Sequence, residues 1–93
     1  MSPRQARAIP ADMCPDWPEV PSNDKVAEVA RRLALNLRRA MLGRSIREVA
    51  SMTGVDRATI GAMLSGQSWP DIVTLAKLER GLGTLWPGVV ESD

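Results

Sequence analysis

Several residue types that carry chemistry in proteins are scarce or missing from this chain of 93 residues. It has no histidine, phenylalanine or tyrosine and a single cysteine, Cys14. The missing histidine removes the commonest metal ligand and the commonest general base. One cysteine excludes an internal disulfide and is typical of a reducing compartment, and its proline-rich surroundings indicate an inert loop residue. The composition therefore predicts no catalytic, metal or cofactor site.

Long hydrophobic runs are also missing. No apolar stretch approaches the length that crosses a bilayer, and the proline-rich start lacks the hydrophobic region of a secretory signal. We therefore expect a cytoplasmic protein without a membrane partner. The length suits one small domain, whose core must be built from Leu, Val, Ile, Met, Ala and three Trp.

Charge is low in total but unevenly distributed. The formal net charge of +1 argues weakly against a nucleic-acid partner. The centre of the chain nevertheless holds seven arginines against two acids, Glu48 and Asp56, whereas both ends are slightly acidic. Because a local patch attracts phosphates regardless of the total charge, this centre is a candidate nucleic-acid surface. The seven are Arg31, Arg32, Arg38, Arg39, Arg44, Arg47 and Arg57.

Residues 1–22 contain five prolines, which exclude a regular helix. We expect an extended arm, which either packs against the helical body through Trp17 or is a disordered leader. Arg4 and Arg7 are potential groove contacts. The acids of the arm outnumber them, so DNA contact by the arm is not favoured.

The first long helix is expected over about 24–42, capped by Asn23 or Asp24 and ended by Gly43. Arg31 and Arg32 are expected on a solvated face. Arg38, Arg39 and Arg44 lie nearer the next helix, where DNA phosphates are expected. The predicted buried stripe comprises Val26, Val29, Ala30, Leu33, Leu37, Ala40 and Met41.

The most informative segment is SIREVASMTGVDRATIGAMLSG, residues 45–66. Ser45 and Glu48 form a capping box that starts a short helix, and Gly54 can take the left-handed conformation that ends it. Asp56 caps a second helix over 56–65. The expected inner faces are Val49, Ala50 and Met52 on the first helix, and Ile60, Met63 and Leu64 on the second.

The outer face of the second helix carries one arginine and several small residues, an arrangement that suits a helix lying against another surface. Together with the glycine turn, it predicts a helix-turn-helix that reads DNA. Arg57 is the strongest candidate for reading a base, and its alternative role is an ion pair with Asp56 or Glu48. For Gly61 the alternative is structural: only a small residue would let the two helices cross closely.

Pro70 and Asp71 are expected to start a last helix, which Gly81 and Gly83 loosen and stop. Trp69 is expected to cap the core. The tail either folds back on the core through Leu85 and Trp86, seeds a further helical turn, or meets a partner subunit. The apolar face predicted for the last helix comprises Ile72, Val73, Leu75, Ala76, Leu78 and Leu82.

The order of elements and one spaced pattern resemble the lambda-repressor-like helix-turn-helix family, which includes Cro and the phage repressors. The similarity covers roughly residues 25–85. The pattern A-x-x-x-G-[VM]-x-x-x-x-[IV]-G-A-x-x-x-G is filled by Ala50, Gly54, Val55, Ile60, Gly61, Ala62 and Gly66.

This resemblance implies an all-α, compact bundle of four to five helices, here preceded by the proline-rich arm. It also implies that the second helix of the motif enters the major groove. Many members place Gln at the start of the motif's first helix, where this chain has Ile46, and Arg47 is the candidate substitute. The base-reading positions carried over from the family are Arg57, Ala58, Gly61 and Ala62.

Short polar and basic residues around the motif are predicted to bind phosphates. These are Arg38, Arg44, Ser45, Arg47, Thr59, Ser65, Gln67 and Ser68. The predicted organisation is an arm over 1–22, a DNA-binding domain over 23–86 and a short tail over 87–93.

The predicted function is sequence-specific binding of double-stranded DNA by a homodimer, on a pseudo-palindromic operator of a bacterial or phage promoter. Repression is the simplest outcome. The alternative is an antitoxin-like or adaptor protein that binds a protein partner through residues 1–22 and autoregulates its operon. A purely structural bundle, whose arginines only form a solvated face, is a further alternative.

Overall fold

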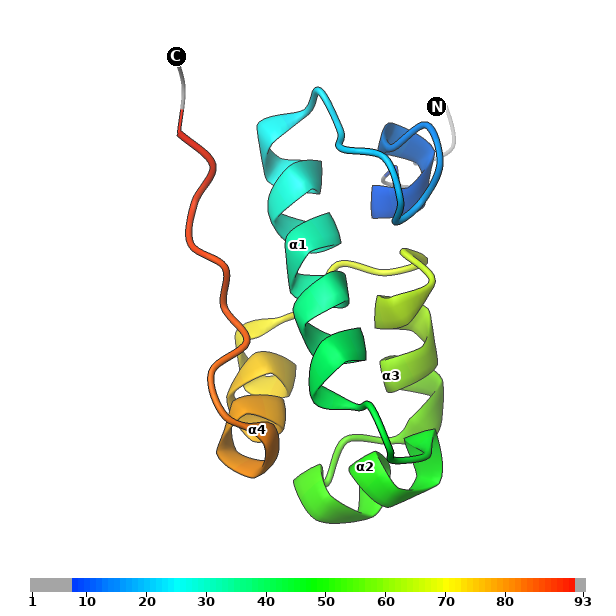
Figure 1. The fold of residues 1–93 in the computed structure, drawn as a ribbon, viewed down its shortest axis with the longest axis vertical. Helices are drawn as coiled ribbons and strands as arrows, with labels where there is room; N and C mark the ends of the chain where they lie inside the picture. Colours follow the sequence, from blue (N-terminus) through cyan, green and yellow to red (C-terminus); the bar gives the residue numbers. More distant parts are fainter. Residues whose placement is uncertain (1–7, 92–93) are drawn as a thin grey trace, which may run out of the picture.

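The computed structural model describes residues 8–91 and is helical in all of its regular elements (Figure 1). A short 3₁₀ helix, η1, precedes four α-helices. Their bounds are η1 Pro10–Met13, α1 Lys25–Ala40, α2 Ile46–Thr53, α3 Arg57–Leu64 and α4 Ile72–Leu82. The all-α bundle of four to five helices is therefore confirmed. Arg4 and Arg7 of the predicted arm lie outside the described residues.

Helix α1 begins where the sequence predicts. The Asp24 carboxylate accepts hydrogen bonds from the backbone N–H groups of Val26 and Ala27, both at 2.9 Å. The helix ends at Ala40, two residues before the predicted Leu42. Gly43, at φ +82°, lies in the turn that follows.

The buried face of α1 is wider than predicted and is rotated about the helix axis. Val26, expected in the core, is 66% exposed, whereas Ala27 and Ala34 are buried. The reason is that α1 is covered on two sides, by α3 and by η1. The prediction assumed that the side under η1 faces solvent.

Arg31 corrects the prediction most clearly, because it is 9% exposed and not on a solvated face. Its Nε and Nη2 donate to the Glu28 carboxylate at 2.8 and 2.7 Å, and its Nη1 donates to the Pro18 carbonyl at 3.0 Å. Arg32 also donates to Glu28, at 2.8 Å, while remaining exposed. This buried pair anchors the segment that contains Pro18 to α1.

The segment 8–22 is not the extended arm that the prolines predicted. It contains η1, started by Pro10, because proline is compatible with the first position of a helix. Pro10 is buried and Cys14, expected to be a loop residue, is 5% exposed. The predicted packing of Trp17 is confirmed, because its indole Nε1 donates to the Leu64 carbonyl at 2.8 Å.

Helix α4 is capped by Asp71, which accepts from the Thr74 N–H at 2.7 Å. The predicted broad apolar face is wrong at three positions, because Ile72 is 83% exposed and Val73 and Ala76 are also exposed. The helix also continues through Gly81, which was expected to loosen it. A Cβ at Gly81 would lie 2.8 Å from Cγ2 of Thr53, so this glycine lets α4 approach α2 closely.

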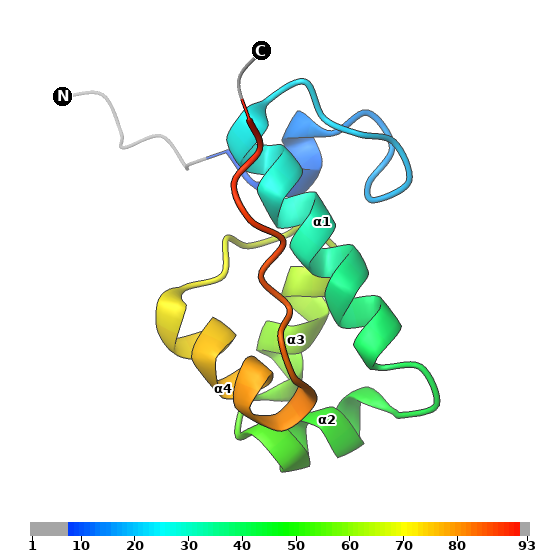
Figure 2. The same cartoon turned by 60° about the vertical axis from the view of Figure 1, so that its left-hand side comes forward.

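The tail folds back, as one of the expected alternatives proposed. Leu85 is 2% exposed and belongs to the core. The Glu79 carboxylate accepts from the N–H groups of Leu85 and Trp86 at 2.8 and 2.9 Å, and these bonds lower the pKa of Glu79. The Leu85 carbonyl accepts from Asn36 of α1 at 2.8 Å. Figure 2 shows the tail running in front of α3 toward the start of α1.

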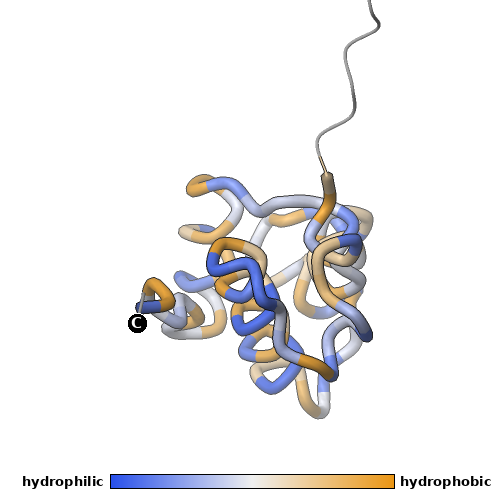
Figure 3. Tube along the Cα trace, turned by 90° about the horizontal axis from the view of Figure 1, so that it is seen from above, coloured by the Kyte–Doolittle hydropathy of each residue, from blue (hydrophilic) through white to orange (hydrophobic). Residues whose placement is uncertain are grey.

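The core lies where the four helices and the tail meet. Apolar and polar residues alternate along each helix, so each contributes one stripe to it (Figure 3). Within residues 8–91, none of the helices has the length and apolarity that a membrane crossing requires. The core residues are Leu33, Leu37, Met41, Val49, Val55, Ile60, Met63, Leu78 and Leu85.

Candidate nucleic-acid interface

The first half of the candidate site, α2, starts at the predicted capping box. The Ser45 hydroxyl accepts from the Glu48 N–H at 3.1 Å, and the Glu48 carboxylate accepts from the Ser45 N–H at 2.9 Å. Val49 is fully buried and Ala50 packs against the core. Met52, predicted inside, is 45% exposed, because an eight-residue helix presents only a narrow stripe to α3 and α4.

The turn between α2 and α3 depends on Gly54, which has φ +78° as predicted. Its N–H donates to the Ala50 carbonyl at 2.9 Å and closes the helix. Val55 then enters the core. Glycine takes this left-handed conformation without a Cβ penalty, so the chain can reverse between two closely spaced helices.

Helix α3 begins at the predicted cap. The Asp56 carboxylate accepts from the N–H groups of Ala58 and Thr59 at 2.8 and 3.3 Å and from the Thr59 hydroxyl at 2.6 Å. These bonds, led by the Thr59 hydroxyl, lower the pKa of Asp56. Thr59 thus donates its one hydroxyl hydrogen within the protein, and its hydroxyl can donate to a phosphate only by releasing Asp56.

The two faces of α3 are divided as the sequence predicts. Ile60 and Met63 are buried and Leu64 packs against the core. On the opposite face Arg57 and Ala58 are exposed, and Gly61 and Ala62 are half-buried.

The structural alternative for Gly61 is contradicted. A Cβ built at Gly61 would meet no atom within 4 Å, so the helices do not need a glycine there to cross. The absence of a side chain at Gly61 instead leaves a flat place on the outer surface of α3.

Arg47 of α2 and Arg57 of α3 line one shallow hollow of about 400 Å³ at the turn of the motif. Both side chains are exposed. Arg57 is in none of the ion pairs that residues 8–91 form, so its alternative role with Asp56 or Glu48 is not observed there. Two free guanidinium groups at the rim of one hollow can reach a single anionic surface.

The remaining phosphate candidates differ in how free they are. Arg44 and Ser45 are exposed at the turn before α2. Arg38 is exposed but donates to the Glu19 carboxylate, with the ion pair at 3.3 Å. A phosphate contact by Arg38 therefore competes with Glu19, and this exposed pair is weak enough to be exchanged.

The candidates beyond α3 are partly engaged in local structure. The Ser65 hydroxyl donates to the Gly61 carbonyl at 2.9 Å, which is the helix-end role expected as its alternative. Gln67 is exposed and Ser68 is half-buried. The Trp69 indole donates to the Ala8 carbonyl at 2.7 Å, so this ring is held beside the N-terminal segment.

Sequence reasoning missed the contact between segment 8–22 and the end of α3. The Ala11 N–H donates to the Gly66 carbonyl at 2.9 Å, beside the bond from Trp17 to Leu64. Nothing in the local pattern around Ala11 points to Gly66, which is more than fifty residues away. In the sequence, the only signals of this contact are Trp17 and Gly66 themselves.

Comparison with known families identifies this arrangement. A sequence model of the helix-turn-helix family matches residues 30–85, more than half of the chain. The chain belongs to the helix-turn-helix family. The resemblance to the lambda-repressor-like, Cro-type members is confirmed, and the match spans α2, the glycine turn and α3. No curated protein and no solved structure matches the chain.

Membership in the helix-turn-helix family indicates a DNA-binding domain. The family consists of DNA-binding regulators, which are not typically enzymes. In the helix-turn-helix the second helix of the motif lies in the major groove and the first crosses the backbone. In this chain α2 is the first helix of the motif and α3 is the second.

Proposed function

We propose that this protein is a sequence-specific transcriptional regulator that binds double-stranded DNA through α3, most simply as a repressor in the bacterial cytoplasm, on the nucleoid. The observation that supports the proposal best is the outer face of α3. Among residues 8–91 that face takes part in none of the ion pairs, and it begins at an exposed arginine and is nearly flat at Gly61 and Ala62.

The proposed reading of bases starts at Arg57. Its guanidinium can donate two hydrogen bonds to guanine O6 and N7, a pairing worth about 1–3 kcal/mol of discrimination. Ala58 and Ala62 act by shape, because their methyl groups can contact thymine methyls. Gly61 adds no side chain, so the helix can seat close to the base edges.

The proposed phosphate contacts surround this face and set the register of the protein on the duplex. Three of them, Arg44, Ser45 and Arg47, lie at the start of α2. In a helix-turn-helix this is the helix that crosses the sugar-phosphate backbone of the DNA. Each arginine that neutralises a phosphate adds about one unit to the salt dependence of binding. The other proposed contacts are Arg38, Thr59, Ser65, Gln67 and Ser68.

A single module reads few base pairs, so we infer that a homodimer binds two half-sites about one helical turn apart, ~34–36 Å. The surface available for association is apolar and includes the start of α4 and the tail. Ile72, Val73, Trp86 and Val89 are among its exposed side chains. Because this surface does not include α3, association leaves the DNA-reading face free.

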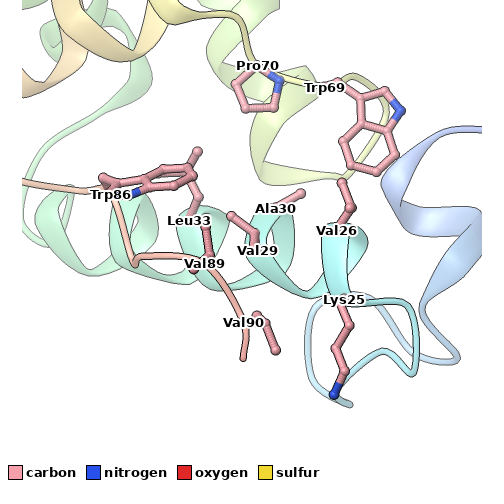
Figure 4. A pocket seen from close by; sticks show the side chains of 10 residues that line it. All are labelled: Lys25, Val26, Val29, Ala30, Leu33, Trp69, Pro70, Trp86, Val89 and Val90. Atoms are coloured by element: carbon pink, nitrogen blue, oxygen red, sulfur yellow. The ribbon is translucent and has the colours of Figure 1, made fainter. Parts of the chain in front are cut away.

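A groove of about 370 Å³ lies within this apolar surface, between the first half of α1, the tail and the loop before α4 (Figure 4). Val29, Trp86 and Pro70 face it, whereas the Lys25 amine points away. The exposed Ile72 and Val73 directly follow this loop. Each molecule therefore presents an apolar groove and, next to it, two exposed apolar side chains. Such a pair suits a two-fold contact with a second copy.

The decisive experiment is selection of bound sequences from a random duplex pool at about physiological salt, where non-specific binding is weak. An inverted repeat with half-sites one turn apart is expected. Failure to enrich any sequence, with the protein folded, would refute the proposed function.

The antitoxin-like or adaptor alternative predicts a stoichiometric protein partner on residues 1–22. In the isolated chain Trp17 of this segment points inward and is bonded to Leu64. A partner that needs this tryptophan must therefore first displace it. Co-purification of a stoichiometric partner, which the Trp17→Ala variant fails to capture, is the outcome that favours this alternative.

A further inference from the structure

The C-terminal end of α3 is held by a segment that lies outside the family match, which begins at residue 30. Two hydrogen bonds cross from this segment to the end of the helix. The Trp17 indole donates to the Leu64 carbonyl at 2.8 Å, and the Ala11 N–H donates to the Gly66 carbonyl at 2.9 Å. In Figure 1 the segment, in blue, lies directly above α3.

Helix α3 needs such support because few of its own side chains are buried in the core. It has eight residues, of which only Ile60 and Met63 are buried. A helix this short is marginal alone, and its last carbonyl groups have no partner inside the helix. The bonds from Trp17 and Ala11 supply partners for two carbonyls at this end.

The contact is also a close steric fit. A Cβ built on Gly66 would lie 2.7 Å from Cδ2 and Cε2 of Trp17 and 3.0 Å from Cβ of Ala11. The indole therefore packs directly on the Gly66 backbone, which only a glycine permits. Gly66 is buried and has φ +72°.

The segment that carries Trp17 is itself fixed to α1. The Pro18 carbonyl accepts from Arg31, and the Ser22 N–H donates to the Glu28 carboxylate at 2.8 Å. Since Glu28 and Arg31 are buried, this end of the segment has a rigid attachment. A continuous chain of contacts thus runs from α1 through Trp17 to the last turn of α3.

We propose that Trp17 is a positioning residue for DNA reading, which fixes the angle and depth at which the outer face of α3 meets the bases. This inference rests on the proposed function. Base readout requires side chains held to within about 0.5 Å, whereas phosphate contacts tolerate small rotations of the helix. Loss of the Trp17 contact should therefore weaken operator binding more than binding to unrelated DNA.

The test compares two affinities for each variant: one for the duplex that the wild-type protein selects, and one for a scrambled duplex of the same length. Trp17→Phe keeps a ring over Gly66 and removes the indole N–H. We expect the ratio of the two affinities to fall about three- to tenfold, the effect of one hydrogen bond, while scrambled-duplex affinity changes less than about twofold. Val20→Ala, which shortens an exposed side chain of the same segment, is the matched control and should leave the ratio unchanged.

Two glycine variants give an independent approach to the same contact. Gly66→Ala places a methyl group against the indole, whereas Gly43→Ala introduces similar backbone strain, at φ +82°, with no atom within 4 Å. The first should lower the affinity ratio and the second should not. In the absence of DNA, amide hydrogen exchange at Ser65 and Gln67 should accelerate in Trp17→Phe and remain slow in Val20→Ala.

The possible outcomes separate the two proposals. A wild-type protein that selects no sequence refutes the proposed function and the positioning role with it. If the wild-type protein selects an operator, an unchanged affinity ratio in a folded Trp17→Phe refutes the positioning role alone. Equal losses for the operator and the scrambled duplex also refute it, because they indicate a general loss of folded protein.

Discussion

The buried pair between Glu28 and Arg31 makes a quantitative prediction about stability. Glu28 is 3% exposed and accepts hydrogen bonds from Arg31, Arg32 and the Ser22 N–H. Chiefly because of the bonds from Arg31, the pKa of Glu28 falls from 4.5 to about 2. The carboxylate is therefore much easier to ionise in the folded chain than in the unfolded chain.

The size and direction of the effect follow from this difference. At 1.36 kcal/mol per unit, the pKa difference contributes about 3 kcal/mol to the free energy of unfolding when the pH is well above 4.5. As the pH falls from about 5 to about 2, the unfolded chain takes up a proton that the folded chain does not. The contribution is then progressively lost, and it is absent once both states are protonated.

Chemical denaturation of the wild type and Glu28→Gln, at several pH values from about 6 down to about 2, measures this contribution. Glutamine does not titrate, and it leaves Arg31 buried without a counter-charge, which adds a cost that does not depend on pH. We expect the difference between the two free energies of unfolding to narrow by about 3 kcal/mol across this range. Glu91→Gln, at an exposed tail position, should parallel the wild type. Parallel curves for Glu28→Gln would show that the buried pair does not control the acid stability.

Three further predictions concern the DNA surface and the helix contacts. Arg57→Ala should flatten the preference at one operator position by about 1–3 kcal/mol, and an unchanged preference profile in a second selection contradicts its base-reading role. Neutralising any one proposed phosphate arginine should reduce the slope of log affinity against log salt concentration by about one unit. A slope equal to that of the wild type would show that the arginine contacts no phosphate and only forms part of a solvated face. Gly61→Ala should keep the wild-type melting temperature but weaken operator binding. Gly81→Ala should lower the melting temperature, because its Cβ would lie 2.8 Å from Thr53. A lower melting temperature for Gly61→Ala than for Gly81→Ala contradicts both assignments. The arginines to be neutralised are Arg38, Arg44 and Arg47.

The helix boundaries were predictable because their causes are local. Asp24, Ser45, Asp56 and Asp71 each accept hydrogen bonds from N–H groups two or three residues ahead. Gly54 has the positive φ that its position at a helix end predicts. These interactions involve neighbours in the sequence, so short-range patterns contain the information.

The buried faces were less predictable because they depend on distant partners. Val26 follows the helical period of the core stripe but lines an open groove, and Arg31 is buried where it pairs with Glu28 and bonds to Pro18. Ile72 and Val73 continue an apolar pattern beyond the area that the core covers. A hydrophobic period shows which residues share a face, but not which of several faces another segment covers.

The candidate site divides in the same way. The outer face of α3 followed from the period of its own inner residues, and from the family resemblance. The engagement of Thr59 with Asp56 was accessible from the cap alone, whereas the pairing of Arg38 with Glu19 was not, since nineteen positions separate the two residues. The contact of Trp17 with the end of α3 spans 47 positions and required the structure.

The way the tail is attached has a practical consequence for handling the protein. Trp86 and Val89 form one wall of the apolar groove, yet this wall belongs to no helix and is held near its start by hydrogen bonds to Glu79 and Asn36. An affinity tag fused directly after residue 91 would therefore extend the segment that forms this wall of the groove. A tag fused directly to Ala8, in place of residues 1–7, would instead begin beside Trp69. Comparing the two tagged proteins separates self-association from DNA binding without changing a single residue of the fold.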